Sequence, residues 1–375
     1  MISQVINLSN DKTFKLYEEK YNYSIKLYNG LNGLELRNIP LELLNAEFNK
    51  KLDNIFYKQD SLLLTGSINE ILDITSLLKL DESLKTAISK AIQNVEKIEN
   101  IHYEIGNKKF DFKFAYVMGI LNVTPDSFSD SGQFVDEDKA ISHAIEMIEN
   151  GVDIIDIGGE STRPGSEPVS ESEESGRVIP VISEILKRKP DAILSVDTTK
   201  ANVAKEALKR GVLIVNDISG GTFEPDIFNV VSEFNAAMIL MHIKGKPKTM
   251  QASPIYTDVV SEVYDYLAVQ SGIAYKHGIE KIIIDPGIGF GKRIEDNLTV
   301  IERLEDFKSL GYPIMIGSSR KSFIGNILNL PIEDRDDATN AMNSFVISKG
   351  AKIIRTHNIK QAVQTCKLIN TMINN

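Results

Sequence analysis

Residues 116–354 alternate between short apolar runs and longer stretches with helical spacing. The apolar runs are nearly continuous, which is typical of parallel strands buried on both faces. In residues 138–149, by contrast, every third or fourth residue is apolar, as on one buried face of a helix. The predicted strands are 116–121, 152–157, 192–196, 213–215, 236–241, 281–284, 312–316 and 352–354.

Glycines separate these repeats at regular intervals. Gly151, Gly211, Gly278, Gly311 and Gly350 each stand just before a predicted strand, where a helix-ending glycine belongs. Eight strand–helix repeats in about 250 residues fit a (β/α)8 TIM barrel, so the fold class is α/β. A doubly wound open sheet is the alternative, but eight evenly spaced repeats favour closure.

The first 110 residues have a different amino-acid composition. They are rich in Asn, Lys and Leu and poor in Gly, and residues 1–115 carry a net charge near −1 against −9 for the remainder. The apolar stripe of residues 82–99 predicts an amphipathic helix, and the tyrosine-rich stretch 17–28 favours a strand. We therefore predict a small N-terminal α+β extension over residues 1–110, which folds separately and has no assigned role, and a catalytic barrel over 115–375.

Composition excludes several classes of protein. Forty-two per cent hydrophobic and 25% charged residues are typical of a soluble globular chain. A net charge of −10 without a basic run argues against nucleic-acid and anionic-membrane binding, and no apolar stretch approaches a membrane span. The single cysteine, Cys366, excludes a disulfide framework, and the five histidines show no metal-binding spacing. The sequence lacks a leader pattern, and we expect a cytoplasmic protein.

Polar residues follow every predicted strand. In a TIM barrel, these carboxyl ends meet at one mouth, where ligands bind. Taken singly, an Asp after a strand is more often a helix cap, and a lone His is more often structural. Because the barrel brings these strand ends together at one mouth, we expect their carboxylates, amides and cations to form a site. Such a site is suited to an anionic and heteroaromatic ligand. The residues concerned are Asn122, Asp156, Asp197, Asn216, Asp217, Met241, His242, Asp285, Lys321, Arg355 and His357.

Long motifs in a fixed order carry a family resemblance. They read GILNVTPDSFSDSG at 119–132, GGESTRPG at 158–165, SVDTTK at 195–200, IVNDISGG at 214–221, MHIKGKPKTMQ at 241–251, DPGIGFGK at 285–292, GSSRKSFIG at 317–325 and IIRTHNI at 353–359. Over residues 115–370 the chain resembles the dihydropteroate synthases, departing slightly at Ile288 and Ser318. The resemblance does not extend to residues 1–110.

The resemblance implies a transferase of folate biosynthesis and a sulfonamide target. It would join (7,8-dihydropterin-6-yl)methyl diphosphate to p-aminobenzoate, with Mg2+ and as a homodimer. The resemblance places the pterin on Asp197, Asn216, Met241, Asp285, Phe290 and Lys321, the diphosphate on Asn122, Arg355 and His357, and p-aminobenzoate on Thr162, Arg163, Pro164 and Ser322. It gives catalytic roles to Asp197, Lys321, Arg355 and His357, and the Mg2+ contact to Asn122.

We expect an SN1-like displacement without a covalent enzyme intermediate. Arg355, His357, Arg163 and Lys321 would supply cationic donors, Asp197 would stabilise a pterin methylene cation, and Phe128 and Pro164 on two mobile loops would exclude water. One alternative is a pterin-binding methyltransferase that acts on methyltetrahydrofolate and has no use for a diphosphate. The other is a non-catalytic barrel that binds pterin or docks a partner.

Overall fold

The computed structural model describes residues 1–375 except 23–29, 40–53, 78–79, 125–132, 164 and 375. The chain forms two compact units. Unit 1 comprises Met1–Glu99 together with Arg303–Gly311, and unit 2 comprises Asn100–Glu302 and Tyr312–Asn375. The division differs from the predicted one in two respects. The break falls at Glu99, and a nine-residue segment from the barrel's half of the sequence groups with unit 1.

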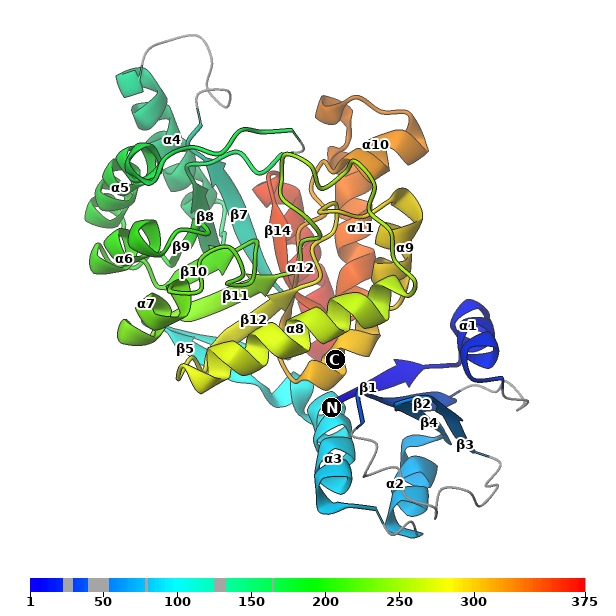
Figure 1. The fold of residues 1–375 in the computed structure, drawn as a ribbon. Helices are drawn as coiled ribbons and strands as arrows, with labels where there is room; N and C mark the ends of the chain where they lie inside the picture. Colours follow the sequence, from blue (N-terminus) through cyan, green and yellow to red (C-terminus); the bar gives the residue numbers. More distant parts are fainter. Residues whose placement is uncertain (23–29, 40–53, 78–79, 125–132, 164, 375) are drawn as a thin grey trace. The chain divides into compact units, whose positions relative to one another are not determined.

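Unit 2 contains a closed barrel of eight parallel strands with helices between them, which confirms the TIM barrel (Figure 1). The strands are β7 (Tyr116–Asn122), β8 (Ile154–Gly158), β9 (Leu194–Asp197), β10 (Ile214–Asp217), β11 (Ala237–Met241), β12 (Ile282–Asp285), β13 (Ile314–Ile316) and β14 (Ala351–Thr356). The helices are α4 (Gln133–Glu149), α5 (Glu171–Arg188), α6 (Ala201–Lys209), α7 (Ile227–Glu233), α8 (Val259–Lys276), α9 (Ile294–Glu302), α10 (Ser322–Leu328), α11 (Asp336–Ser348) and α12 (Ile359–Asn374).

The five predicted helix-ending glycines have the expected backbone. Gly151, Gly211, Gly278, Gly311 and Gly350 all have positive φ, between 81° and 105°. This region is unfavourable for residues with a Cβ atom, so each glycine lets the chain turn sharply into the next strand.

A short antiparallel hairpin closes one end of the barrel. It consists of β5 (His102–Ile105) and β6 (Lys108–Asp111). Ile105, Phe110 and Phe112 share an apolar cluster with residues from the first halves of the barrel strands, and the Tyr103 hydroxyl donates to the Ile282 carbonyl at 2.9 Å. With the amino-terminal end filled, the carboxyl ends of the strands form the mouth.

Unit 1 is built on a four-stranded antiparallel sheet in the order β1-β2-β4-β3. Its elements are β1 (Ile2–Asn7), α1 (Asp11–Tyr21), β2 (Asn32–Arg37), β3 (Ile55–Lys58), β4 (Ser61–Gly66), α2 (Ile68–Leu77) and α3 (Glu82–Lys97). Alternate residues of the strands enter two apolar clusters, one shared with α2 and α3 and the other with α1. The helix predicted at 82–99 is confirmed as α3, followed by the 3-10 turn η3 (Ile98–Asn100).

The strand predicted for the tyrosine-rich stretch is wrong over residues 17–21, which lie in α1. The Asn10 side chain caps this helix by accepting from the backbone N–H groups of Lys12 and Thr13. Tyr17 and Tyr21, four residues apart, then stack on one buried face with ring centres 6.4 Å apart. The remainder of the predicted strand lies largely outside the described residues.

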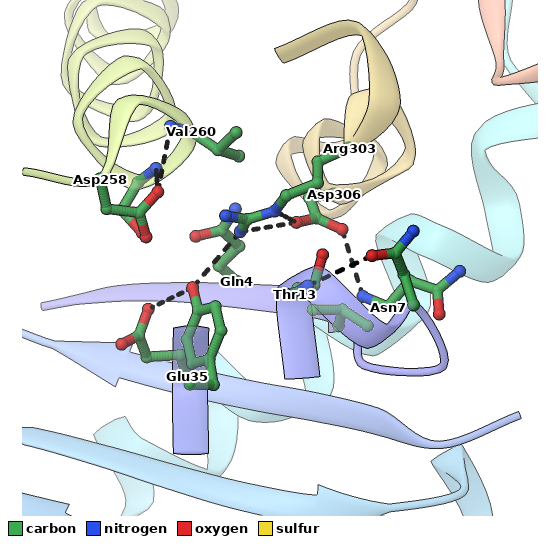
Figure 2. A network of polar contacts seen from close by, with 12 residues as sticks. Gln4, Asn7, Thr13, Glu35, Asp258, Val260, Arg303 and Asp306 are labelled. Carbon is green, nitrogen blue, oxygen red and sulfur yellow. Dashed lines mark hydrogen bonds and ion pairs between the residues drawn. The ribbon is translucent and has the colours of Figure 1, made fainter. Parts of the chain in front are cut away.

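The segment Arg303–Gly311, whose 3-10 helix η5 spans Leu304–Leu310, is hydrogen-bonded into unit 1 (Figure 2). Asp306 Oδ1 accepts from the Asn7 backbone N–H at 3.1 Å, and Ser309 Oγ accepts from that of Val5 at 3.2 Å. Arg303 pairs with Asp306 at 2.9 Å, and both are buried. Unit 1 therefore includes a short segment from the barrel's half of the sequence, and the separate folding of the extension stays a prediction.

Candidate functional site

Polar side chains at the carboxyl ends of the barrel strands are buried close together. Asp197 ends β9, Asn216 is the penultimate residue of β10, and Asp285 ends β12. All three are buried, with Asp285 and Asn216 only 4% and 2% exposed. In the parallel ladder, Asn216 is the register partner of Asp197, which places their side chains on the same side of the sheet.

Arg355, from β14, joins two carboxylates across the mouth. Its Nε donates to Asp156 Oδ2 at 2.6 Å, and its Nη2 donates to Asp197 Oδ2 at 2.7 Å. Burial alone would lower the pKa of Arg355, but these two carboxylates raise it above its usual value. The guanidinium is therefore a fixed positive charge, anchored beside the residues assigned to the pterin.

Burial raises the pKa of Asp197 to about 7. The positive charge of Arg355 acts in the opposite direction, while Asp156 and Glu174 add negative charge nearby. Asp197 thus changes its charge near neutral pH, which is a property of groups that take part in catalysis.

The glycine-rich segment 285–292 forms a second wall of the site. Asp285 Oδ1 accepts from the Gly287 backbone N–H at 2.7 Å. A Cβ at Gly287 would lie 1.9 Å from the His242 carbonyl oxygen, so only glycine fits there. Phe290 shares an apolar cluster with Met241, and the Lys321 Nζ lies 4.1 Å from the centre of the Phe290 ring. These contacts bring the predicted pterin residues of β11, β12 and the segment after β13 together.

The pKa values of Asp285 and Lys321 are shifted in opposite directions. Burial raises the pKa of Asp285, against the Gly287 N–H and the charge of Lys321. Burial and the charge of Arg355 lower the pKa of Lys321 to about 8. The Asp285 carboxylate and the Lys321 ammonium group are thus close enough for each charge to stabilise the charged form of the other.

The surroundings of His357 lower its pKa, and its role towards the diphosphate stays a prediction. Burial and the positive charges of Arg355 and Arg320 lower its pKa to about 3, so its imidazole is neutral. Ser319 Oγ accepts from the His357 backbone N–H at 3.1 Å and lies 2.9 Å from its Nδ1. Ser319 Oγ also accepts from the Thr356 hydroxyl at 3.4 Å, so both of its lone pairs are used. We therefore assign the Ser319 hydroxyl proton to Nδ1 of His357, which leaves the proton of the neutral ring on Nε2.

The described residues assigned to p-aminobenzoate are more exposed than Asp197, Asn216 and Asp285. Thr162 is half-buried, whereas Arg163 and Ser322, the first residue of α10, are exposed. Arg163 contributes to lowering the pKa of His357, which shows that its charge acts on the end of β14. Pro164, and the Phe128 expected to exclude water, lie outside the described residues.

Asn122, the last residue of β7, is half-buried. A Cβ built on Gly158 would lie 3.8 Å from both Asn122 Oδ1 and Asp197 Oδ2, so these two oxygens border the same space. In the described ranges, no three His, Cys, Asp or Glu side chains are grouped as a metal site.

Two residues of the site, Ser319 and Lys292, were not among the predicted mouth residues, and Asp156 was among them without a specific role. Asp156 binds Arg355 and also accepts from Asn216 Nδ2 at 2.9 Å, and Ser319 orients His357. Lys292 is buried and donates to the Gly287 carbonyl at 2.9 Å, which supports the glycine-rich segment. Position at a strand end singled out Asp156, but no pattern in the sequence indicates which side chains meet.

The fold and the mouth define an enzyme that binds pterins, and the family described as "Pterin binding enzyme" matches residues 118–357. The dihydropteroate synthase of Synechocystis sp. is 47% identical over 272 residues, which are 72% of this chain and 94% of that protein. The chain therefore belongs to the dihydropteroate synthase family.

Solved structures agree with this assignment. The Yersinia pestis dihydropteroate synthase in a sulfonamide drug complex superposes with a TM-score of 0.69 at 38% identity, covering 73% of this chain and all of that one. The Xanthomonas albilineans enzyme with 4-aminobenzoic acid gives a TM-score of 0.68 at 34% identity, covering 72% and 97%. The family match begins at residue 118, so Met1–Glu99 of unit 1 lies outside it.

Proposed function

We propose that this chain condenses (7,8-dihydropterin-6-yl)methyl diphosphate with p-aminobenzoate, giving 7,8-dihydropteroate and diphosphate in folate biosynthesis. As a member of its family the chain is a transferase. The observation that carries the proposal is the grouping of buried acceptors and partly buried cations in one mouth. Asp285 and Asn216 match the N–H edge of a pterin, and Lys321 and Arg355 supply positive charge.

The reaction needs one bond to break and one to form. The bond between the pterin methylene carbon and the diphosphate oxygen breaks, and its electron pair leaves with the diphosphate. The ionised Asp197 stabilises the methylene cation, and the guanidinium of Arg355 and the Nε2–H of His357 stabilise the leaving group. The aniline nitrogen of p-aminobenzoate then bonds to the carbon and loses its proton to solvent. Thr162, Arg163, Pro164 and Ser322 are proposed to hold p-aminobenzoate.

Mg2+ is part of this proposal. The chain offers the Asn122 amide oxygen beside the Asp197 carboxylate, and oxygen donors suit this hard cation. With so few protein oxygens, Mg2+ would be held mostly by substrate oxygens and water. When bound, it would neutralise charge on the diphosphate.

Incubating the full chain with both substrates and following dihydropteroate by mass spectrometry tests this function. The methyltransferase alternative predicts instead that methyltetrahydrofolate is demethylated in the presence of a corrinoid acceptor, with no diphosphate released. Product formation from the diphosphate substrate decides between the two reactions and also excludes a non-catalytic barrel.

Asp285→Asn should weaken pterin binding by about 30- to 150-fold. The carboxylate is proposed to accept from two N–H donors of the ring, and an amide would oppose one of them with its own N–H. Mispairing of a buried charged partner costs about 2–3 kcal/mol. Calorimetry with a pterin lacking the diphosphate measures the change, and Asp334→Asn, an exposed carboxylate, is the control. Unchanged affinity in Asp285→Asn would refute this assignment.

Activity should rise with pH between about 6 and 8. Asp197 acts as an anion, and its pKa, raised to about 7, means that the active form gains population as pH increases through this range. The measurement is kcat/KM against pH. Asp197→Asn should have a much lower kcat/KM and lack this rising limb. A wild-type profile that is flat from pH 6 to 8 would show that Asp197 does not titrate in the free enzyme.

The oligomer and the cellular setting are also proposals. Phe345, Leu368 and Met372 are exposed apolar residues on the neighbouring helices α11 and α12, and a second copy of the chain is the proposed cover. Light scattering of the purified chain measures its mass.

Among the described residues, no helix is long and apolar enough to cross a bilayer. We propose a cytoplasmic homodimer that is inhibited by sulfonamides, drugs that the Yersinia relative binds.

A further inference from the structure

Asp156 occupies the centre of the buried hydrogen-bond network at the mouth. Its side chain is fully buried at the middle of β8. One oxygen, Oδ2, accepts from both Arg355 Nε at 2.6 Å and Asn216 Nδ2 at 2.9 Å. A single carboxylate oxygen thus ties together a proposed diphosphate residue and a proposed pterin residue from opposite parts of the barrel.

This contact fixes the orientation of the Asn216 amide. An amide has a donor end and an acceptor end, and a carboxylate accepts but does not donate. Because Asp156 can only accept, Nδ2 of Asn216 must face it, and Oδ1 must face away. Asn216 Oδ1 is buried and has no hydrogen-bond partner in the described part of the chain. Asp156 Oδ1 is unpartnered there as well. At the mouth, a ligand N–H would complete Asn216 Oδ1.

The charge of Asp156 has a second consequence. Together with Asp197, it holds the two ends of the Arg355 guanidinium at 2.6 and 2.7 Å. A guanidinium held by two carboxylates is restricted in rotation, because both hydrogen bonds would break if the side chain turned. Its position in the mouth is therefore set before substrate arrives.

We propose that Asp156 is a positioning residue with two roles. It makes Asn216 an acceptor for a ring N–H donor of the pterin, and it holds Arg355 in position to contact the leaving group. Asp156 itself does not touch substrate. The proposal rests on the proposed function and names the group that sets the hydrogen-bond polarity of the pterin site.

Asp156→Asn removes both the charge and the polarity constraint. The introduced amide can donate to Asn216 Oδ1, so the Asn216 amide is free to turn its N–H groups towards the ligand. We expect 6-hydroxymethylpterin to bind about 10- to 100-fold more weakly by calorimetry. Asn216→Asp should also weaken binding, since two carboxylate oxygens would then face each other without a donor between them.

The double variant Asp156→Asn with Asn216→Asp is the decisive test. It restores a donor–acceptor pair between the two positions and again presents an oxygen to the ligand. Pterin affinity should recover to within about tenfold of wild type, whereas a merely structural role for Asp156 predicts that the two losses add. Asp306→Asn, in another buried Asp–Arg pair, is the control and should lower the melting temperature without changing pterin affinity.

The outcomes separate this inference from the proposed function. A wild-type chain that forms no dihydropteroate contradicts the function. A wild-type chain that turns over, with Asp156→Asn folded and of unchanged pterin affinity, contradicts the positioning role alone. Additive losses in the double variant contradict it as well.

Discussion

Arg355→Lys should lower kcat by about 100-fold or more. Lysine keeps the charge, but it cannot span Asp156 and Asp197 as the guanidinium does at 2.6 and 2.7 Å. The lost group is proposed to stabilise charge that collects on the departing diphosphate. Its loss therefore affects the transition state more than bound substrate, on the scale of one preorganised electrostatic donor.

The same variant should bind a pterin lacking the diphosphate within about tenfold of wild type. Asn216, Asp285 and Lys321 remain, and the new ammonium group still neutralises part of the buried negative charge. Lysine is preferable to alanine here, since alanine would leave Asp156 and Asp197 buried without a cation. Arg188→Lys, in an exposed pair on α5, is the control. Collapse of pterin binding with kcat preserved would show that the role assigned to Arg355 is wrong.

Removing residues 1–102 should lower the melting temperature of the remaining chain by about 10 °C or more. Hydrogen bonds between described residues join Arg303–Gly311 to the N-terminal part of unit 1. Four of them are donated by Asn7, Val5 and Asn94 to the segment and by Arg303 to the Tyr17 hydroxyl. At about 1 kcal/mol each they contribute about 4 kcal/mol, and the truncation also uncovers apolar groups. Leu304 and Phe307 are fully buried in the whole chain.

Calorimetry of the chain beginning at Tyr103 measures this loss. We still expect the truncated chain to turn over at a temperature at which it remains folded, because the proposed substrate residues all lie in unit 2. In the full chain, Asp306→Asn should lower the melting temperature, while Glu305→Gln, in a partly exposed pair with Lys308, should have little effect. An unchanged melting temperature on truncation would contradict the role of the extension as a partner of this segment.

The barrel could be predicted from the sequence because the patterns that indicate it involve residues close together in the chain. Continuous apolar runs, helical spacing and helix-ending glycines each depend on neighbouring residues, and together they predicted all eight strands. Position at a strand end then brought Asp197, Asn216, Asp285 and Arg355 into one mouth, since a closed parallel barrel places all these ends together.

Other features depend on contacts between distant residues. The neutral state of His357 results from burial beside cations such as Arg355 and Arg320, which a formal charge does not reveal. The shared oxygen of Asp156 depends on how two side chains turn, and the grouping of residues 303–311 with the N-terminus joins positions about 300 apart. The tyrosine-rich helix was missed because aromatic residues favour strands, whereas a capping Asn10 and i, i+4 packing stabilise a helix here.

Diphosphate release from (7,8-dihydropterin-6-yl)methyl diphosphate, with and without p-aminobenzoate, is the most direct test of the proposed reaction. With p-aminobenzoate, the full chain should release diphosphate and form dihydropteroate in equal amounts. Without p-aminobenzoate, release should be slow and should yield no dihydropteroate. Absence of diphosphate release under both conditions, from a folded chain that binds the pterin, would contradict the assignment of this mouth to a condensation driven by diphosphate departure.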